Sequence, residues 1–472
     1  MTDWQAEVAQ RKTDLMTDLQ TMLEIPSVRD DSKATDDAPL GPGPKAALET
    51  FLSLAKRDGF RTKNIDNVVG YVELGDPDAE ETLAVLAHVD EMPADTGWDT
   101  DPFTPTLKDG RLYARGASDD KGPGMAAYYG LKIVSELGLP LKRKIRFIVG
   151  TDEESDWTGM NRYFEVEPAP TLGFSPDAEF PIINGEKGNI TVKATFEGGQ
   201  DAEADNTLIS FVSGERDNMV PAQADAVITS GDNEALVSDF TAFLDQAPVT
   251  GEVTIEEDGI HLHVDGKASH GAMPENGINA GTYLAAFLAD QSFSGAAIDF
   301  LTFVRDDVHD DTVGAHLGVA ITDEVMGALS LNIGILRFAE QAGQVTLNFR
   351  YPKNTTAEAL TDAVIKAAQA HNGTAKAGRA MVPHYVDAED PIVKTLLDIY
   401  HEQTGLPAKE EVVGGGTYGR LMKRGVAFGA MFPDTPDTMH QPNEFIPVDD
   451  LYRAAAIYAQ AIAELGNQTD AD

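Results

Sequence analysis

Residues 83–90 read LAVLAHVD, so a run of five apolar residues ends abruptly at His88, and Asp90 follows two positions later. A short, wholly apolar run is typical of a strand that is buried on both faces of a mainly parallel sheet. Three more runs share this design: IRFIVG at 145–150 stops at Asp152-Glu153-Glu154, LGF at 172–174 stops before Asp177, and VAFGA at 426–430 leads to His440. The sequence predicts an α/β fold whose strands release metal-type side chains at their carboxyl ends, where open sheets bind ligands.

Segments with helical periodicity surround these strands. Apolar residues at helical spacing predict one amphipathic helix over 5–23, a helix over about 45–58 and a helix over about 125–137. The stretch 29–44 lacks periodicity and is rich in Asp, Gly and Pro, which predicts an extended loop. We therefore expect a parallel sheet with helices on both faces.

A different pattern begins near residue 190. Strand-like stretches such as 189–196 and 345–350 alternate with helical ones such as 233–245 and 280–289, which is typical of an α+β domain. Because the metal-type residue His440 lies after this region, the second domain is expected to be inserted into the first. The predicted boundaries are 1–186 and 383–472 for a catalytic metal-binding domain and 187–382 for an inserted lid domain.

The charge balance limits the classes of partner that the protein can bind. The 472 residues include 36 Lys+Arg, 78 Asp+Glu and no Cys, for a formal net charge of -42. Nucleic acid and anionic membrane surfaces are excluded as partners because both require cationic patches. Disulfides, thiolate nucleophiles and cysteine-bound metals are excluded too, so any metal must be held by nitrogen and oxygen.

The chain shows no signal for secretion or membrane insertion. The first ten residues, MTDWQAEVAQ, have neither the basic nor the apolar region of a secretory signal. No uncharged apolar run approaches the ~20 residues that span a bilayer. We expect a soluble cytoplasmic protein with no membrane partner.

Three short motifs carry the expected chemistry. Asp90 stands two residues after His88 and so points to the same side of an extended segment, where it can orient the imidazole toward a metal. The segment RGASDDKGPG at 115–124 places Asp119 at a Gly-rich helix entry, which favours anionic side chains. Glu153 and Glu154 diverge, so one can bind metal while the other faces an attacking water. Taken alone, each motif also fits solvated surface or a helix cap.

Together these motifs resemble the co-catalytic zinc metallopeptidase family that contains aminoacylases, glutamate carboxypeptidases, desuccinylases and dipeptidases, and within it the PepV-type dipeptidases. The resemblance covers essentially the whole chain. It is carried by LEIPSVRDDS (23–32), PLGPGP (39–44), HVD (88–90), RGASDDKGP (115–123), TDEES (151–155), SPDAEFP (175–181), NMVP (218–221), GKASHGAMPENGINA (266–280), NFRYP (348–352) and GGGTYGR (414–420). Glu91-Met92 departs from the two small apolar residues usual there, which we expect to affect packing rather than ligation.

The resemblance implies a role for each candidate residue. His88 and Asp177 would hold one metal ion, Glu154 and His440 the other, and Asp119 would bridge both. Glu153 would be the general base and Asp90 the partner that orients His88, and the peptide bond between Asp119 and Asp120 would be cis. Zinc is the implied metal, with manganese or cobalt as alternatives.

The charge arithmetic supports two divalent ions independently. Three ligand carboxylates and one bridging hydroxide supply four negative charges, which match the four positive charges of two ions. The expected reaction is attack of that hydroxide on a polarised amide carbonyl.

Substrate contacts are expected from the inserted domain and a glycine-rich segment. Arg350 ends an alternating strand and is the strongest candidate to clamp a substrate carboxylate. The resemblance adds Asn218, Gly415 and Gly416 near that carboxylate, and assigns His270 to the oxyanion. A lid of this size can supply His270 within one chain, so a monomer is expected, with a homodimer as the alternative.

Dipeptides with a free N-terminus are the substrates that the resemblance implies, whereas the residues by themselves indicate only metal-assisted amide hydrolysis. Two alternatives remain at this point: N-acyl amino acid deacylation or carboxypeptidase action by the same site, and a non-catalytic protein that binds metal or peptide. The histidines at 261, 263, 309, 316, 371, 384 and 401 are interpreted as structural or surface residues.

Overall fold

The chain divides into two compact units in the computed structural model, which describes residues 2–199 and 204–470. The first unit comprises Met1–Gly185, Tyr385–Glu411 and Gly416–Asp472, and the second comprises Glu186–His384 and Val412–Gly415. Each unit has a sheet and a large buried apolar cluster. Each therefore has the core that a separately packed domain requires.

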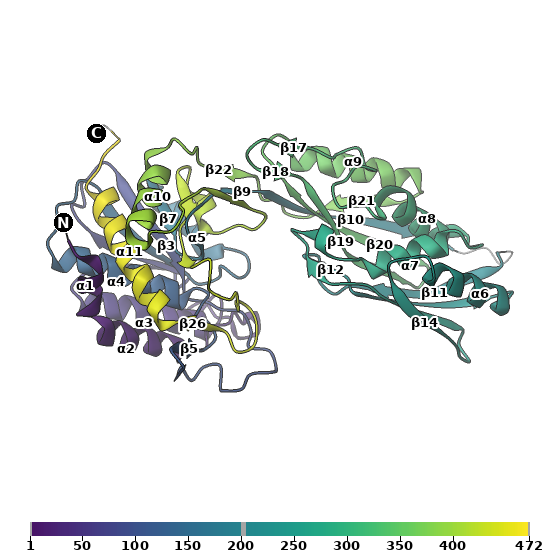
Figure 1. Ribbon diagram of the computed structural model, residues 1–472, viewed down its shortest axis with the longest axis horizontal. Helices are drawn as coiled ribbons and strands as arrows, with labels where there is room; N and C mark the ends of the chain where they lie inside the picture. Colours follow the sequence, from purple (N-terminus) through teal and green to yellow (C-terminus); the bar gives the residue numbers. More distant parts are fainter. Residues whose placement is uncertain (1, 200–203, 471–472) are drawn as a thin grey trace. The chain divides into compact units, whose positions relative to one another are not determined.

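The first unit is built on a nine-stranded sheet (Figure 1). Four central strands run parallel, and the strand next to them on each side is antiparallel. The prediction of a mainly parallel sheet is confirmed for the strands that precede the candidate ligands, so their carboxyl ends share one edge. The strand order is β1 (Arg61–Ile65), β2 (Val69–Leu74), β6 (Lys144–Gly150), β3 (Thr82–His88), β7 (Leu172–Ser175), β24 (Gly425–Ala427), β9 (Ile183–Glu186) and β22 (His384–Tyr385), with β23 (Glu411–Val413) paired to β9.

Helices cover both faces of this sheet, as predicted. Val85 and Ala87 of β3 point into one apolar cluster, and the alternate residues Ala84 and Leu86 point into another. The second cluster includes Met160 of α5 (Thr158–Val166). The larger cluster contains residues of α1 (Trp4–Ala9), α2 (Lys12–Leu23), α3 (Pro42–Arg57), α4 (Lys121–Glu136), α10 (Pro391–Thr404) and α11 (Val448–Gly466).

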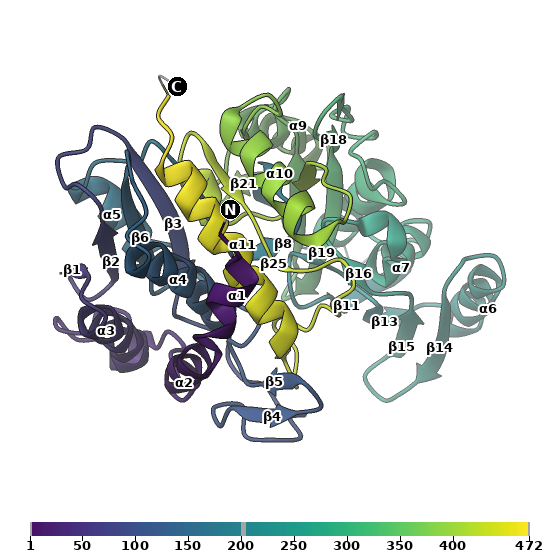
Figure 2. The ribbon, with the colours of Figure 1, turned by 60° about the vertical axis from the view of Figure 1, so that its left-hand side comes forward.

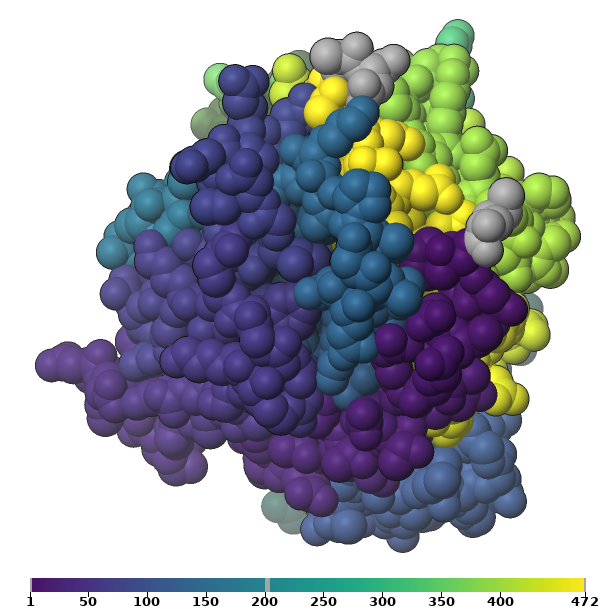
Figure 3. All heavy atoms as spheres, turned by 90° about the vertical axis from the view of Figure 1, so that its left-hand side faces the viewer, coloured from purple at the N-terminus to yellow at the C-terminus, as the bar shows by residue number. Residues whose placement is uncertain are grey.

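Helices α4 and α11 lie side by side in this larger cluster (Figure 2). Figure 3 faces the same layer and shows the purple N-terminal residues, the blue residues of α4 and the yellow residues of α11 adjoining one another. Their closest approach is at Gly130, where an added Cβ would lie 2.8 Å from the backbone nitrogen of Ala459. A glycine is therefore required there by the neighbouring backbone.

The second unit is built on an eight-stranded sheet in which all neighbouring strands are antiparallel. Burial alternates along strands such as Gly188–Glu197 and Ile260–Asp265, because one face packs against helices and the other does not (Figure 1). The strand order is β14 (Thr250–Ile255), β15 (Ile260–Asp265), β13 (Gln223–Ser230), β11 (Asn206–Ser213), β19 (Ser330–Ala339), β20 (Ala342–Tyr351), β10 (Gly188–Glu197) and β21 (Thr374–Ala377); the helices are α6 (Asn233–Leu244), α7 (Ala280–Ala289), α8 (Gly295–Phe303) and α9 (Ala357–Ala370).

Short pairs of strands complete the two units. In the first unit β26 (Phe445–Pro447) pairs with β5 (Arg111–Tyr113), which pairs with β4 (Thr106–Lys108), and β25 (Ala430–Met431) pairs with β8 (Ala178–Glu179). In the second unit β12 (Met219–Val220) pairs with β16 (Ser269–His270), and β17 (Thr322–Asp323) pairs with β18 (Gly327–Ala328). These pairs hold loops that carry candidate site residues.

The single helix predicted over 5–23 is wrong, because the chain breaks between α1 and α2 at Gln10 and Arg11. The guanidinium of Arg11 is held there by Glu7 and Glu136, at 2.9 and 2.7 Å. The loop predicted over 29–44 also contains a short 3-10 turn at Asp31–Lys33, and α3 begins within its last residues.

The strand predicted over 426–430 is wrong in its second half. The chain leaves β24 after Ala427 and begins β25 at Ala430, in a different sheet. Gly429 between them has a φ of 74°, which breaks an extended strand. A Cβ at this glycine would also lie 2.2 Å from the ring of Phe180. The apolar run is therefore continuous in sequence but bent by core packing.

Replacing Gly130 by Ala tests the contact between α4 and α11. Helix propensity alone predicts a stabilisation of about 1 kcal/mol. A methyl group forced against the backbone of α11 predicts a destabilisation of about 1–3 kcal/mol. We expect the steric cost to exceed the propensity gain, so the melting temperature should fall. A higher melting temperature in a thermal unfolding experiment would show that the two helices are not closely packed here.

Candidate metal centre

The candidate ligands of the first unit lie at the ends of neighbouring parallel strands. His88 is the last residue of β3, Glu153 and Glu154 follow β6, and Asp177 follows β7. Parallel strands bring their carboxyl ends to one edge, which explains why residues so far apart in sequence meet. Two loops add further groups: Asp119 immediately before α4, and His440 between β25 and β26.

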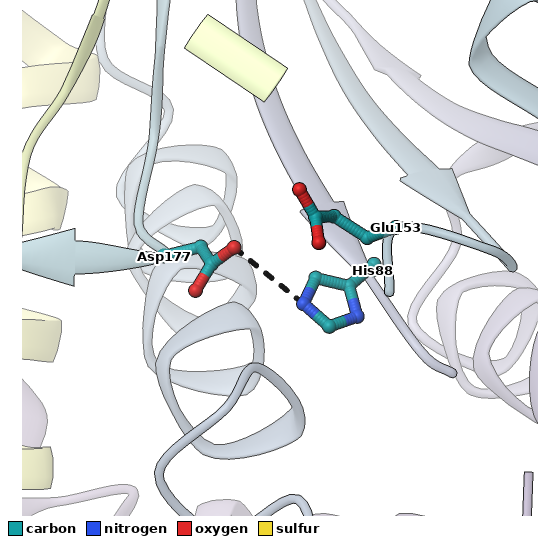
Figure 4. Close-up of side chains that lie close together, drawn as sticks. All are labelled: His88, Glu153 and Asp177. Atoms are coloured by element: carbon teal, nitrogen blue, oxygen red, sulfur yellow. Dashed lines mark ion pairs between the residues drawn. The ribbon is translucent and has the colours of Figure 1, made fainter. Parts of the chain in front are cut away.

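One group of potential ligands consists of His88, Glu153 and Asp177, whose ligand atoms all lie within 4.8 Å of one another. Figure 4 shows the three side chains converging, with Asp177 Oδ2 at 3.5 Å from Nε2 of His88. His88 is almost fully buried, at 1% exposure. An imidazole and two carboxylates are nitrogen and oxygen donors that suit a divalent cation.

A second group consists of Asp119, Glu154 and His440, again within 4.8 Å of one another. Nε2 of His440 lies 2.9 Å from Oδ2 of Asp119 and 3.0 Å from Oε1 of Glu154. The other oxygen of Asp119, Oδ1, lies 3.1 Å from Nε2 of His88. Asp119 therefore contacts one imidazole of each group, which is the arrangement that a carboxylate shared by two ions requires.

The imidazole of His88 is held from behind by Asp90. Nδ1 of His88 lies 3.1 Å from the backbone carbonyl oxygen of Asp90 and 3.3 Å from its Oδ1. Oδ2 of Asp90 accepts a hydrogen bond from the backbone N–H of Glu154 at 3.2 Å. Asp90 thus contacts the residue that ends β3 and a residue that follows β6. This placement leaves Nε2 of His88 directed at the carboxylates.

Burial first, and then repulsion between neighbouring carboxylates, raises the pKa values of three carboxylates in the cluster. Burial and the neighbouring Asp119 raise the pKa of Glu154 to about 7. Burial and Asp177 raise the pKa of Glu153 well above its usual value. Hydrogen bonds to Asp119 and Glu154 raise the pKa of His440 to about 11, although burial opposes this. Carboxylates that resist ionisation and an imidazole that retains its proton both indicate a place for positive charge, so the donor set fits divalent metal ions.

The peptide bond between Asp119 and Asp120 is cis, as the resemblance implies. Asp120 is fully buried, and its Oδ2 accepts a hydrogen bond from the backbone N–H of His88 at 3.0 Å. Asp120 therefore supports the strand end that carries His88.

Two buried ion pairs beside the cluster were missed from the sequence. Glu91 pairs with Lys121 at 2.6 Å, and both side chains are 0% exposed. Glu91 belongs to none of the candidate ligand groups, but it does more than fill space: its carboxylate is a buried counter-charge and also accepts from the backbone N–H of Ser27. Glu444 pairs with Arg115 at 2.6 Å. The sequence offered one sign of such pairs: Glu91 is a charged residue that closely follows the apolar run of residues 83–87.

The second unit gathers the predicted substrate residues. His270 is exposed on β16, which pairs with β12, and the backbone N–H of Gly271 donates to the carbonyl oxygen of Asn218 at 2.7 Å. Partial enclosure of its ring and the nearby Arg350 guanidinium lower the pKa of His270. Nη1 of Arg350, a residue only 7% exposed, donates to the carbonyl oxygen of Gly414 at 2.8 Å.

Arg350 thus contacts the glycine-rich segment through Gly414, which belongs to the same unit. Of the two predicted glycines, Gly415 follows Gly414 in the second unit and Gly416 belongs to the first. An added Cβ would meet nothing within 4 Å at Gly415, whereas at Gly416 it would meet the guanidinium of Arg420 at 2.1 Å. Gly416 is therefore the glycine of this pair whose lack of a side chain the packing requires.

A third group of potential ligands lies on the hairpin of β14 and β15 and consists of Glu256, Asp258 and His261. Both of these carboxylates are exposed, and His261 lies 2.8 Å from Asp258 as an ordinary ion pair. His263 is likewise 2.8 Å from Asp225.

Among the described residues, no helix is both long and apolar enough to cross a membrane.

The chain is similar to known proteins over most of its length. The model of the family described as Peptidase family M20/M25/M40 matches residues 84–464. A Bacillus subtilis (strain 168) protein named "Putative dipeptidase YtjP" is 44% identical over 465 residues, which are 98% of this chain and 99% of the relative.

Two solved structures resemble the fold. An aminoacylhistidine dipeptidase from Vibrio alginolyticus has a TM-score of 0.59 and 16% identity, with 96% of this chain and 97% of that chain covered. Human carnosine dipeptidase 1 has a TM-score of 0.56 and 15% identity, with 98% of this chain and 99% of that chain covered. The family match, the B. subtilis relative and the motifs agree, and the chain is a metallopeptidase that belongs to peptidase family M20/M25/M40.

Proposed function

We propose that this protein is a two-metal dipeptidase that removes the N-terminal residue from short peptides, mainly dipeptides with a free amino group. The observation that carries the proposal is the position of Asp119, whose two oxygens contact His88 at 3.1 Å and His440 at 2.9 Å. The family supplies the reaction class, and the relative and solved structures that are named as dipeptidases support the substrate class.

Each ion would have its own ligands and share one. His88 and Asp177 would hold the first ion, Glu154 and His440 the second, and Asp119 both. These three carboxylates and two neutral imidazoles carry three negative charges, and a hydroxide completes the neutralisation of two divalent ions. Zinc is the proposed metal, because imidazole and carboxylate donors suit it, and manganese or cobalt would fit the same donors.

The chain's own groups would move the proton. Two divalent ions, when bound, would lower the pKa of a water molecule and polarise the amide carbonyl. Glu153 belongs to the buried carboxylate cluster, and its raised pKa suits a group that takes a proton and gives it up again. We assign it as the base that takes the proton of the attacking water and passes it to the leaving amine. Asp90 keeps His88 in the orientation that its ligand role requires.

The second unit would bind the rest of the substrate. Arg350 has a planar guanidinium that can bind a carboxylate through two hydrogen bonds, and Asn218, Gly415 and Gly416 would add donors to the same group. His270 would donate to the oxyanion that forms at the attacked carbonyl. Its lowered pKa keeps the ring neutral near pH 7, and a neutral imidazole still has one N–H to donate. Residues 1–186 and 383–472 would form the catalytic domain, and 187–382 the inserted lid.

Replacing Glu153 by Gln separates the base from the ligands. The variant should still bind two ions but lose activity by about 10²–10⁴-fold, the usual contribution of a general base. The matched variant Glu154→Gln should lose affinity for one ion as well as activity. Metal content by elemental analysis and dipeptide hydrolysis give the two readouts. Loss of one ion in Glu153→Gln would make Glu153 a ligand and contradict the assignment.

The free amino group of the substrate distinguishes a dipeptidase from a deacylase. We expect hydrolysis of an unmodified dipeptide and at least a roughly tenfold lower kcat/KM for its N-acetyl derivative, because acetylation removes a charge that the site would have to recognise. Both rates are measured on the same metal-loaded preparation. Cleavage of the acetylated peptide alone would replace the dipeptidase proposal by N-acyl amino acid deacylation.

Mixing two inactive variants tests whether His270 serves its own chain. We propose a cytoplasmic monomer, so co-expressed His270→Ala and Glu153→Gln chains should show no more activity than either variant alone. If a partner subunit supplied His270, random dimers would restore about a quarter of the sites, because half of the dimers are mixed and each has one intact site. Restored activity, together with a dimer on size-exclusion chromatography, would contradict the proposal.

A further inference from the structure

A buried ion pair joins two distant parts of the first unit. Nη1 of Arg115 donates to Oε2 of Glu444 at 2.6 Å, and the two side chains are 1% and 0% exposed. A pair buried this completely contributes little net stability, because desolvation offsets most of the attraction. Its role is therefore to be sought in what else the two side chains hold.

The second oxygen of Glu444 holds the backbone beneath Asp119. Oε1 accepts hydrogen bonds from the backbone N–H groups of Ser118 and Asp119, at 2.7 and 3.2 Å. Hydrogen bonds to a carboxylate are stronger than those between neutral groups. The side chain of Asp119 projects from this backbone and contacts both His88 and His440. Glu444 thus restrains the residue on which both ligand groups depend.

Glu444 also belongs to the segment that carries His440. It stands four residues after His440, and its carbonyl oxygen accepts from the backbone N–H of Ala114 at 3.2 Å. The residues that follow it form β26, which pairs with β5 just before Arg115. One carboxylate and one strand pair therefore fix the segment of Asp119 and the segment of His440 against each other.

Arg115 is itself anchored on three sides. Its backbone N–H donates to the carbonyl oxygen of Pro102 at 2.9 Å, and Nη2 donates to the carbonyl oxygen of Pro93 at 3.2 Å. Its guanidinium carbon lies 5.4 Å from the centre of the Trp98 ring. A fixed cation at this place offsets the charge of Glu444, which would otherwise repel Asp119.

We propose that Glu444 is a positioning residue of the metal centre, with Arg115 as its counter-charge. Together they hold Asp119 where both ions can share it and keep the His440 segment in register with it. Neither residue belongs to the candidate ligand groups. The inference rests on the proposed two-metal function.

Two variants of Glu444 separate its reach from its charge. Glu444→Asp keeps the charge but is one methylene shorter, so it cannot reach both Arg115 and the two backbone N–H groups. Glu444→Gln keeps the length but removes the charge. In calorimetric titrations of the metal-free full chain with Zn²⁺, we expect both variants to bind both ions about 10- to 100-fold more weakly than the wild type. The affinity for both ions should fall, because both would share Asp119.

Asp18→Asn is the matched control. Asp18 is a carboxylate of 4% exposure that accepts hydrogen bonds from Arg57 and from the hydroxyl group of Tyr129, away from every candidate ligand. Its replacement should lower the melting temperature but leave both Zn²⁺ affinities unchanged. If Glu444→Gln does not fold, Arg115→Lys takes its place, since lysine keeps the charge but loses the planar fork, and it should weaken both affinities.

The outcomes are distinct. Wild-type Zn²⁺ affinity in Glu444→Asp, or an equal loss of affinity in Asp18→Asn, would overturn the positioning role while leaving the two-metal function in place. A wild-type protein that binds fewer than two ions would overturn the two-metal function, and the positioning role with it. The inference is supported if both Zn²⁺ affinities fall in the Glu444 variants and stay unchanged in Asp18→Asn.

Discussion

The crowding of four carboxylates in a largely enclosed site is the constraint on which this structure depends. Asp119, Glu153, Glu154 and Asp177 meet around two imidazoles, and burial together with neighbouring charges raises the pKa of the last three. Such a cluster is costly in a metal-free protein and is stabilised by cations. The parallel strands of the first unit make the cluster possible. Their apolar residues pack on both faces of the sheet, and the acidic residues and His88 stand at their carboxyl ends.

Other groups of the first unit hold the residues of the cluster in place. Asp90 and Asp120 hold His88 from its imidazole and from its backbone, and Glu444 holds the backbone of Asp119. The buried cation Arg115 accompanies Glu444 in turn. His88 and Asp119 are therefore pre-organised, and neither would have to move far to bind a metal ion. The second unit carries the predicted substrate residues, with exposed His270 and buried Arg350 both on antiparallel strands.

Much of the fold was predictable because its signals are local. The apolar runs that end at His88, Asp152 and Asp177 show both the strands and the edge where the site lies. The errors arose where contacts distant in sequence override the local pattern. Gly429 bends an apolar run because the ring of Phe180 lies against it, and Arg11 leaves the helical path where Glu7 and Glu136 hold it. Neither neighbour can be identified from periodicity.

The sequence by itself determined which side chains bring metal chemistry and that they follow buried strands, since residue type and hydrophobic period are properties of short segments. Tertiary structure alone placed Glu153 with His88 and Asp177, whereas the contact of Asp119 with both imidazoles agrees with the bridging role that the resemblance implies. It also decided that Glu444 meets Arg115, 329 residues earlier in the chain. Such pairings depend on strand order and loop paths, which follow from packing the whole chain rather than from any one segment.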